Sequence, residues 1–427
     1  MRYLVILIAL GTVSAAPTYT ADIRPILERR CVKCHAPGEV APMPLRSYQE
    51  VRPWAKSIKE EVELRRMPPW HAMPSHHAFR NDRSLSETEI KTIAEWVDRG
   101  SPEGETAPPI PVAAAASGWK LGTPDIVVEV PGFQVPARGV LPYNFLIVPL
   151  HLDHDVWVRA AEFRIDQRQV VHHMNAFVRP PGSSYLAGFP RETVFAPTVA
   201  QRAVKREGEG LFARRQLLLG YEPGYAPMDW LPDSAKLIPA GSDLILEIHY
   251  NPNGKAVVDH SHFGLYFAKG TPRHRILAID TLRNLDLQIP PGDAAYRSTA
   301  AATFEEPVKL LAIQPHMHLR GKSMRVTAVY PDQRDEVLLD VPKYDFNWQT
   351  TYVLARPLAL PAGTKLVSVA YFDNSPNNRF NPDPSATVHW GDQTFNEMHI
   401  AFLELVLDVK ADAEKLFAIE PPGIKPR

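Results

Sequence analysis

Leu244-Ile245-Leu246-Glu247-Ile248-His249-Tyr250 is a short apolar run interrupted only by one carboxylate and one histidine. Similar runs recur beyond residue 119, and Pro, Gly, Asn and Asp separate them. Short runs with this punctuation are typical of β-strands joined by turns. We therefore predict a mainly β region made of two jelly-roll β-sandwich domains, at 119–268 and 269–427. The other runs are Asp125–Val130, Phe145–Leu150, Val156–Ala160, Lys309–Ile313, Met324–Tyr330, Lys365–Tyr371 and Ile400–Leu407.

The composition narrows the class of protein. Proline accounts for 42 of the 427 residues, about twice its average share. Because proline interrupts helix interiors, this argues against a helical bundle. Lys and Arg together number 47 against 48 Asp and Glu, for a net charge of −1. A general nucleic-acid binder needs a basic excess, so that class is excluded.

The first 16 residues have the pattern of a secretory signal peptide. Met1-Arg2 is a short positive start, Tyr3–Leu10 is apolar, and Val13-Ser14-Ala15 offers small residues for cleavage. The alternative is a transmembrane anchor, but the apolar run is too short for a hydrocarbon core of ~30 Å. We expect an exported protein, periplasmic or secreted, with no membrane span in its mature form.

The two cysteines lie together in Cys31-Val32-Lys33-Cys34-His35. C-x-x-C-H is the attachment motif of c-type haem, in which two thiols reach the porphyrin vinyl groups and the histidine binds the iron. A thioredoxin-like redox pair needs a βαβ context that is missing here. Half of a zinc site is a further alternative, with no second half in view. We predict haem c on Cys31, Cys34 and His35.

Haem iron in electron-transfer cytochromes often takes methionine as its second axial ligand. Met67 is our choice, because Pro68 and Pro69 would hold its loop stiffly against the haem. The alternative makes Met67 a core residue and gives the iron a nearby histidine. The other side chains that lie close along the chain are Met43, Met73, His71, His76 and His77.

Two helices are predicted around the haem motif. Ala21–Arg30 resembles an opening helix, and Ser86-Glu87-Thr88-Glu89 is a capping box that starts a second helix, which Gly100 ends. These helices define a small all-α cytochrome c-like domain at 17–105. A Pro- and Ala-rich linker follows at 106–118.

Several histidines fall inside the predicted strands. Residues i and i+2 of a strand face the same way, so His316 and His318 can hold one ion. His172 and His173 are adjacent and would face opposite sides of a regular strand. A bulge or a twist of the strand would be needed to bring both to one metal.

The ligand types indicate copper. A single strand histidine is more often structural than a ligand, but a cluster points to metal. Imidazole suits copper and zinc, and a thioether selects for copper(I). Two sites are therefore expected, an all-histidine site and a His-His-Met site. Further candidate ligands in this region are His249, Met174 and Met398, the last in Asn396-Glu397-Met398.

Residues 119–410 resemble the copper type II, ascorbate-dependent monooxygenases, the group of the peptidylglycine α-hydroxylating and dopamine β-monooxygenases. The resemblance implies a jelly-roll pair with one copper on each domain. It implies that His172, His173 and His249 hold an electron-storing copper. It also implies that His316, His318 and Met398 hold the copper that binds O2 and substrate. The matching motifs, in order, are His172-His173-Met174, Leu246-Glu247-Ile248-His249-Tyr250, His316-Met317-His318-Leu319-Arg320-Gly321 and Asn396-Glu397-Met398.

The implied reaction is hydroxylation of a substrate C–H bond with O2. Peptide-hydroxylating members place Arg and Tyr where this chain has Gln314 and Phe402, which argues against a peptidylglycine substrate. The substrate is therefore left as a small molecule or a peptide-like compound. The electron donor is ascorbate or a redox protein, and the haem is expected to pass electrons to the coppers.

Other readings remain open. A non-catalytic redox or copper-handling protein would use the same ligands, and a binding module tethered to a cytochrome is a further alternative. His151, His154, His260, His262 and His274 are predicted surface residues. Candidates for supporting the metal ligands through hydrogen bonds are His389, His399, Asp392 and Gln393.

Overall fold

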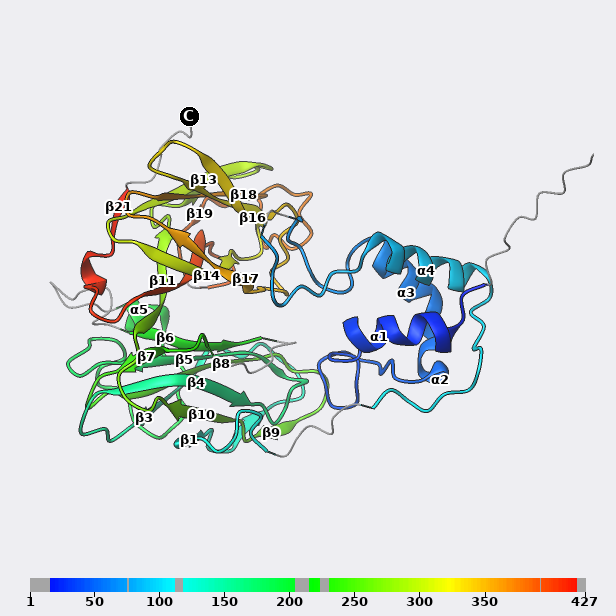
Figure 1. Cartoon of the computed structure of the whole chain (residues 1–427), viewed down its shortest axis with the longest axis horizontal. Helices are drawn as coiled ribbons and strands as arrows, with labels where there is room; N and C mark the ends of the chain where they lie inside the picture. The colour runs from blue at the N-terminus through cyan, green and yellow to red at the C-terminus, as the bar shows by residue number, and fades with distance from the viewer. Residues whose placement is uncertain are drawn as a thin grey trace, which may run out of the picture. The chain divides into compact units, whose positions relative to one another are not determined.

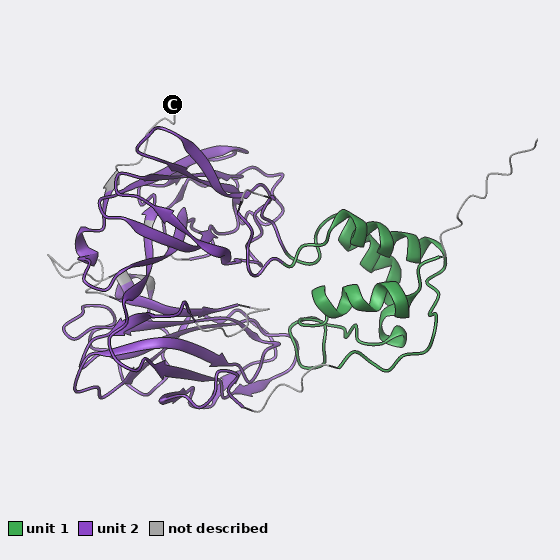
Figure 2. Ribbon diagram, viewed as in Figure 1, with its two compact units in different colours: residues 1–69, 83–113 green, residues 70–82, 114–427 purple. Residues whose placement is uncertain are grey.

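A computed structural model describes residues 16–74, 77–111, 118–203, 215–222, 230–391 and 393–420 (Figure 1). Most of the predicted signal peptide and residues 112–117 of the predicted linker lie outside these ranges, as do His76 and Asp392. The chain forms two compact units (Figure 2). The first combines Met1–Pro69 with Arg83–Ala113, and the second combines Trp70–Asp82 with Ala114–Arg427. Residues 70–82, which we placed in the cytochrome-like domain, therefore group with the β region.

The first unit is helical. Ser86 forms the predicted capping box with Glu89, and the chain turns at Gly100 with a φ of +88°. Leu27, Ile93 and Trp96 are fully buried between the helices. Its elements are η1 (Tyr19–Ile23), α1 (Arg24–Arg30), α2 (Tyr48–Val51), η2 (Arg52–Trp54), α3 (Ala55–Glu63) and α4 (Glu87–Asp98).

The N-terminal half of the second unit has two β layers. A four-stranded sheet, β3-β8-β5-β6, packs across an apolar core on the strands β1-β10-β4-β7. The elements are β1 (Ile126–Glu129), β2 (Phe133–Val135), β3 (Asn144–Pro149), β4 (Val156–Arg164), β5 (Val171–Arg179), α5 (Val199–Ala203), β6 (Gln216–Tyr221), β7 (Ser234–Ile238), β8 (Asp243–Tyr250), β9 (Val257–Asp259) and β10 (His262–Phe267).

The C-terminal half repeats this two-layered arrangement. A five-stranded sheet, β16-β15-β18-β13-β21, packs across a second core on β11-β20-β14-β17. The elements are β11 (His274–Arg283), β12 (Gln288–Ile289), β13 (Tyr296–Phe304), β14 (Val308–His316), β15 (Gly321–Val329), β16 (Asp335–Val341), β17 (Tyr352–Leu360), β18 (Lys365–Phe372), β19 (Val388–His389), β20 (Ile400–Asp408), η3 (Ala413–Lys415) and β21 (Phe417–Glu420).

One eight-stranded sheet runs through both halves. Its β7 pairs in parallel with β11, where His274 lies opposite Ser234. The buried Lys236 on β7 adds an ion pair of 2.6 Å to Glu404 on β20. The mainly β fold is confirmed, and every predicted apolar run overlaps a strand. The sheets are open rather than closed, and no described helix is long and apolar enough to cross a membrane.

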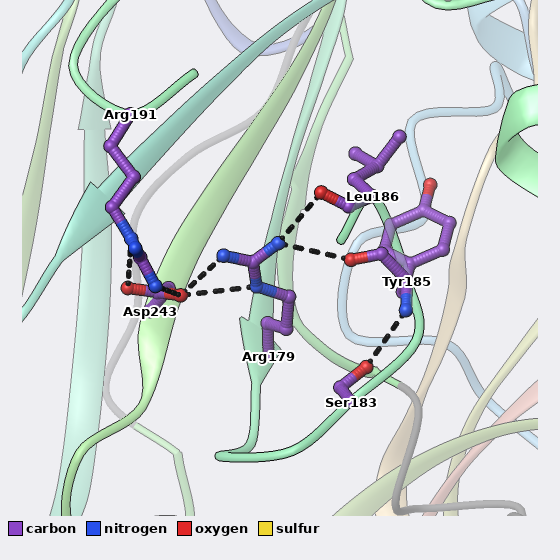
Figure 3. A network of polar contacts seen from close by, with 6 residues as sticks. All are labelled: Arg179, Ser183, Tyr185, Leu186, Arg191 and Asp243. Carbon is purple, nitrogen blue, oxygen red and sulfur yellow. Dashed lines mark hydrogen bonds and ion pairs between the residues drawn. The ribbon is translucent and has the colours of Figure 1, made fainter. Parts of the chain in front are cut away.

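A buried ion pair fixes the end of β5 and β8 that lies away from their histidines (Figure 3). Arg179 Nε donates to Asp243 Oδ2 at 3.1 Å, and its Nη1 donates to the carbonyls of Tyr185 and Leu186. Burial opposes ionisation of Asp243, but Arg179 and Arg191 hold its pKa below the usual value. The pair therefore anchors the loop after β5 to the strands that carry the all-histidine cluster.

Candidate metal centres

β5 and β8 bring three histidines together. Their antiparallel register sets His173 opposite His249, and it shifts between Val171 and His173, so that His172 is the extra residue of a bulge. This confirms a bulge as the irregularity that the adjacent histidines required. The ligand nitrogens of His172, His173 and His249 all lie within 4.8 Å of one another.

The cluster has the chemistry of a metal site. His172 Nδ1 and His173 Nδ1 are 3.1 Å apart, close to the ~3.3 Å that separates two nitrogens on one tetrahedral ion with bonds of ~2.0 Å. His249 Nδ1 is buried without a hydrogen-bond partner. Such an atom is unfavourable unless something binds it, and a metal would satisfy it. The three residues therefore fit a copper ion.

Burial keeps these imidazoles neutral. It lowers the pKa of His249 to about 4 and that of His172 below its usual value. The pKa of His173 falls well below 6.5, first through burial and then through the neighbouring histidines. Since a ligand imidazole must be unprotonated, the site is prepared for metal at neutral pH. Tyr143 stacks on His249 with ring centroids 4.8 Å apart.

A second cluster forms where β14 ends. His316 is the last residue of β14 and pairs with Ile400 on β20, and His318 follows in the next turn. The two rings are nearly perpendicular, with centroids 5.2 Å apart. His316 Nδ1 donates to Gln349 Oε1 at 2.6 Å, and His318 Nδ1 donates to the Asn396 carbonyl at 3.2 Å. In His316 this bond engages Nδ1, so Nε2 is the nitrogen that would hold a metal. His318 also has a hydrogen bond to the backbone of Gln393, so Gln393, a predicted supporting residue, contacts this histidine.

Glu397 connects this cluster to Met398, and its role was not predicted. The side chain is fully buried, and its two oxygens accept from the backbone N–H groups of His318, Arg320 and Met398 at 2.8, 2.6 and 3.3 Å. His318 and Met398 share the same oxygen, which places the methionine beside the histidine turn. Burial raises the pKa of Glu397 to about 8 against the opposing effect of these N–H groups. In the sequence, only the position of Glu397 inside the Asn396-Glu397-Met398 motif could have indicated this role.

The two clusters lie close enough to interact. The charge that His316 carries when protonated contributes to the low pKa of His173. Glu222, just after β6, accepts from the Thr351 N–H at 3.2 Å, near Gln349. A contact between the two halves of the second unit therefore lies close to the C-terminal cluster, which the sequence could not establish.

Other predicted residues take different roles. His399 is buried in the C-terminal core, where Ser298 and Ser368 each lie 2.8 Å from one of its ring nitrogens. It therefore does not support a metal ligand, because both nitrogens are already bonded. His389 is exposed on β19. The ring of Phe402 lies 5.8 Å from that of His316, and Gln314 donates to the Gln349 carbonyl at 2.8 Å.

The haem motif follows α1 in the helical unit. The backbone N–H groups of Cys34 and His35 both donate to the Cys31 carbonyl, which closes a turn around the two thiols. Both cysteines are free and half-buried, and burial raises the pKa of Cys31 to about 12. His35 Nδ1 donates to the Met43 carbonyl at 3.1 Å and so presents Nε2 to an iron. These residues fit a c-type haem.

The candidates for the second axial ligand lie in different parts of the chain. The carbonyl of Met43 accepts from His35 Nδ1. His71, Met73 and His77 belong to the second compact unit. Met67 lies in the helical unit, half-buried after α3, so it stays our prediction.

Copper should be retained well below neutral pH. Burial lowers the pKa of His249 to about 4 and that of His318 to about 3, so protons compete with metal only near those values. In the metal-free chain, stability should fall as the pH drops from 6.5 towards 4, because unfolded imidazoles bind protons first. Dialysis across pH 4–7 followed by elemental analysis measures bound copper. Half-loss near pH 6.5 would contradict the predicted protection.

Comparisons with known proteins agree with the copper chemistry. Residues 275–405, which include His316, His318 and Met398, match the family "Copper type II ascorbate-dependent monooxygenase, C-terminal domain". The chain is 27% identical over 149 residues to MOXD1 homolog 1 of Drosophila melanogaster, covering 32% of this chain and 21% of that protein. It is 26% identical over 176 residues to DBH-like monooxygenase protein 1 of Mus musculus, covering 38% and 27%. The matches support an oxidoreductase of the copper monooxygenase type.

The similarity is partial. The matched stretches span less than a third of the length of either curated relative. Among solved structures, infectious bursal virus derived T=1 particles align over 70% of this chain and 72% of that chain. The TM-score of 0.19 and the identity of 8% are too low to carry an argument.

Proposed function

We propose that this protein is an exported haem–copper monooxygenase that hydroxylates a C–H bond of its substrate with O2. The observation that carries the proposal is the pair of neighbouring clusters, one of His172, His173 and His249 and one of His316 and His318, to which we add Met398 as the proposed third ligand. The family match covers the second cluster. Copper bound at these sites would supply one-electron redox chemistry for the activation of O2.

The C-terminal cluster is the proposed site of hydroxylation. Gln349 and the Asn396 carbonyl hold the two imidazoles in fixed orientations, and Glu397 joins the histidine turn to Met398. A thioether is a weak ligand that favours copper(I), and two imidazoles with one thioether leave an open position. The ring of Phe402 packs edge-on against that of His316, and the ring of Phe346 packs edge-on against that of His318.

The all-histidine cluster is the proposed electron store. Its three imidazoles are neutral, and Tyr143 covers one of them. The effect of His316 on the pKa of His173 shows that the two clusters lie within electrostatic range of each other. The donor is proposed to be the c-type haem on Cys31, Cys34 and His35, supplied in turn by ascorbate or a redox protein. The substrate is a small molecule or a peptide-like compound.

Removing the haem should stop donor-driven turnover. The Cys31→Ser/Cys34→Ser double variant has no thiol to attach the porphyrin. Without the haem, a protein donor should be unable to pass electrons to the coppers. We expect O2 consumption with a reduced redox protein to fall to background, while a small-molecule reductant still supports it. Oxygen uptake in the presence of substrate measures both.

Lys33→Ala is the matched control, because it changes one of the two residues between the cysteines and keeps both thiols. It should leave donor-driven turnover unchanged. Full donor-driven turnover in the Cys31→Ser/Cys34→Ser variant would refute the haem as the electron supplier.

A further inference from the structure

A strap from the helical part of the sequence packs on the C-terminal β half. We define the strap as residues 70–74 and 77–82, which leave the helical unit after Pro69 and re-enter it at Arg83. The side chain of Ala72 is buried in the C-terminal core, and Trp70 and Phe79 pack against that core. The strap is therefore built into the second compact unit.

The strap covers two open sheet edges. β17 is the edge strand of the eight-stranded sheet, and β16 is the edge strand of the five-stranded sheet. Phe79 forms an antiparallel bridge with Leu354 on β17, and flanking backbone bonds join Arg80 to Val353 and Ala355 to Ala78. Met73 donates its N–H to the Asp340 carbonyl on β16 at 2.8 Å. Unpaired edges are unfavourable, so the strap stabilises both layers.

Asn81 fixes the segment just before β17. Its Nδ2 donates to the Thr351 carbonyl at 2.7 Å, and its Oδ1 accepts from the Val353 N–H at 3.0 Å. Between these two bonds, the ring of Tyr352 packs on Trp70 and Phe79 with centroids 4.8 and 5.6 Å away. Three consecutive residues, 351–353, are thus held by the strap.

This segment carries the group that orients His316. Gln349 lies two residues before Thr351, and its Oε1 accepts from His316 Nδ1 at 2.6 Å. Its carbonyl accepts from the side chain of Gln314 at 2.8 Å. A displacement of residues 351–353 would move Gln349 and release the imidazole.

We propose that the strap is a positioning element for the C-terminal copper site, acting through Asn81 and Tyr352 on Gln349 and so on His316. The inference rests on the proposed function, because it assumes copper at His316. If the proposal is correct, the C-terminal copper site depends on the strap, which lies in the sequence between two segments of the helical unit. Asn81 is a positioning residue and contacts no ligand of the site.

Copper affinity of the full chain, measured one site at a time, tests this proposal. A His173→Ala background leaves only the C-terminal site, and a His316→Ala background leaves only the all-histidine site. In the first background, Asn81→Ala should raise the copper(II) dissociation constant about tenfold, as loss of support behind a ligand typically does. The electron paramagnetic resonance spectrum of the bound copper should change with it. In the second background, Asn81→Ala should change neither quantity.

Asn253→Ala is the matched control, because this exposed asparagine caps a turn in the other half of the unit. It should leave both sites unchanged. A C-terminal dissociation constant within twofold of the parent in Asn81→Ala would overturn the proposal, even if the variant unfolds more readily. If Asn81→Ala abolishes both sites through misfolding, Phe79→Leu is measured against the same two criteria. Absence of copper from the C-terminal site of the parent would instead overturn the proposed function.

Discussion

Replacing His316 with alanine is expected to abolish O2-dependent hydroxylation while leaving copper at the all-histidine site. His316 is one of two imidazoles at the C-terminal cluster, and its ring is already oriented by Gln349. Its loss should lower turnover by more than ~100-fold, the upper end of what losing a supporting contact costs. Oxygen uptake with substrate and copper content per chain are the two measurements.

His389→Ala is the control for this variant, because it removes an exposed histidine from the same half of the unit. It should retain both copper and turnover. Retention of O2 consumption by His316→Ala would count against a monooxygenase and favour a protein that uses copper only for electron transfer or storage.

Replacing Glu397 with alanine is expected to destabilise the C-terminal half strongly. The change leaves three backbone N–H groups, those of His318, Arg320 and Met398, without their acceptor in a fully buried position. Unpaired buried groups cost ~1–3 kcal/mol each, so we expect a loss of roughly 3–5 kcal/mol in the free energy of unfolding. The C-terminal copper should be lost as well, because Met398 is no longer joined to the histidine turn.

Urea denaturation of the metal-free chain measures the first effect. Glu306→Ala, which removes an exposed carboxylate from the same half, should change the free energy of unfolding by less than ~0.5 kcal/mol. A loss below ~1 kcal/mol in Glu397→Ala would show that the carboxylate does not hold this region together.

The strands were predictable from the sequence, because alternating apolar residues and turn residues mark them locally. Lys309–Ile313 and Ile400–Leu407, for example, lie within β14 and β20. The capping box at Ser86 was equally local. The parallel pairing of β7 with β11 was not predictable, since it rests on two residue pairs from distant segments. The packing of the strap on the β region was not predictable either, because its residues show neither a helical nor a strand periodicity.

The all-histidine cluster was predictable, together with an irregularity of its strand, because adjacent histidines in a regular strand face opposite sides. The structure shows that this irregularity is a bulge. The groups that support the C-terminal cluster were not. Gln349 is 33 residues from His316, and nothing in its neighbourhood marks it as a partner. His399 follows Met398 directly, yet it faces two serines in the core. Both residues lie in the segment just before β20, where the sequence does not indicate which way a side chain points.

The most direct test of the two-site proposal is the metal content per chain of the full protein, matured with haem and then loaded with copper. Two coppers per iron, falling to one in the His316→Ala/Met398→Ala variant, is the result that the structure predicts. Iron without tightly bound copper would contradict it, and would leave a haem motif joined to a β region with another function.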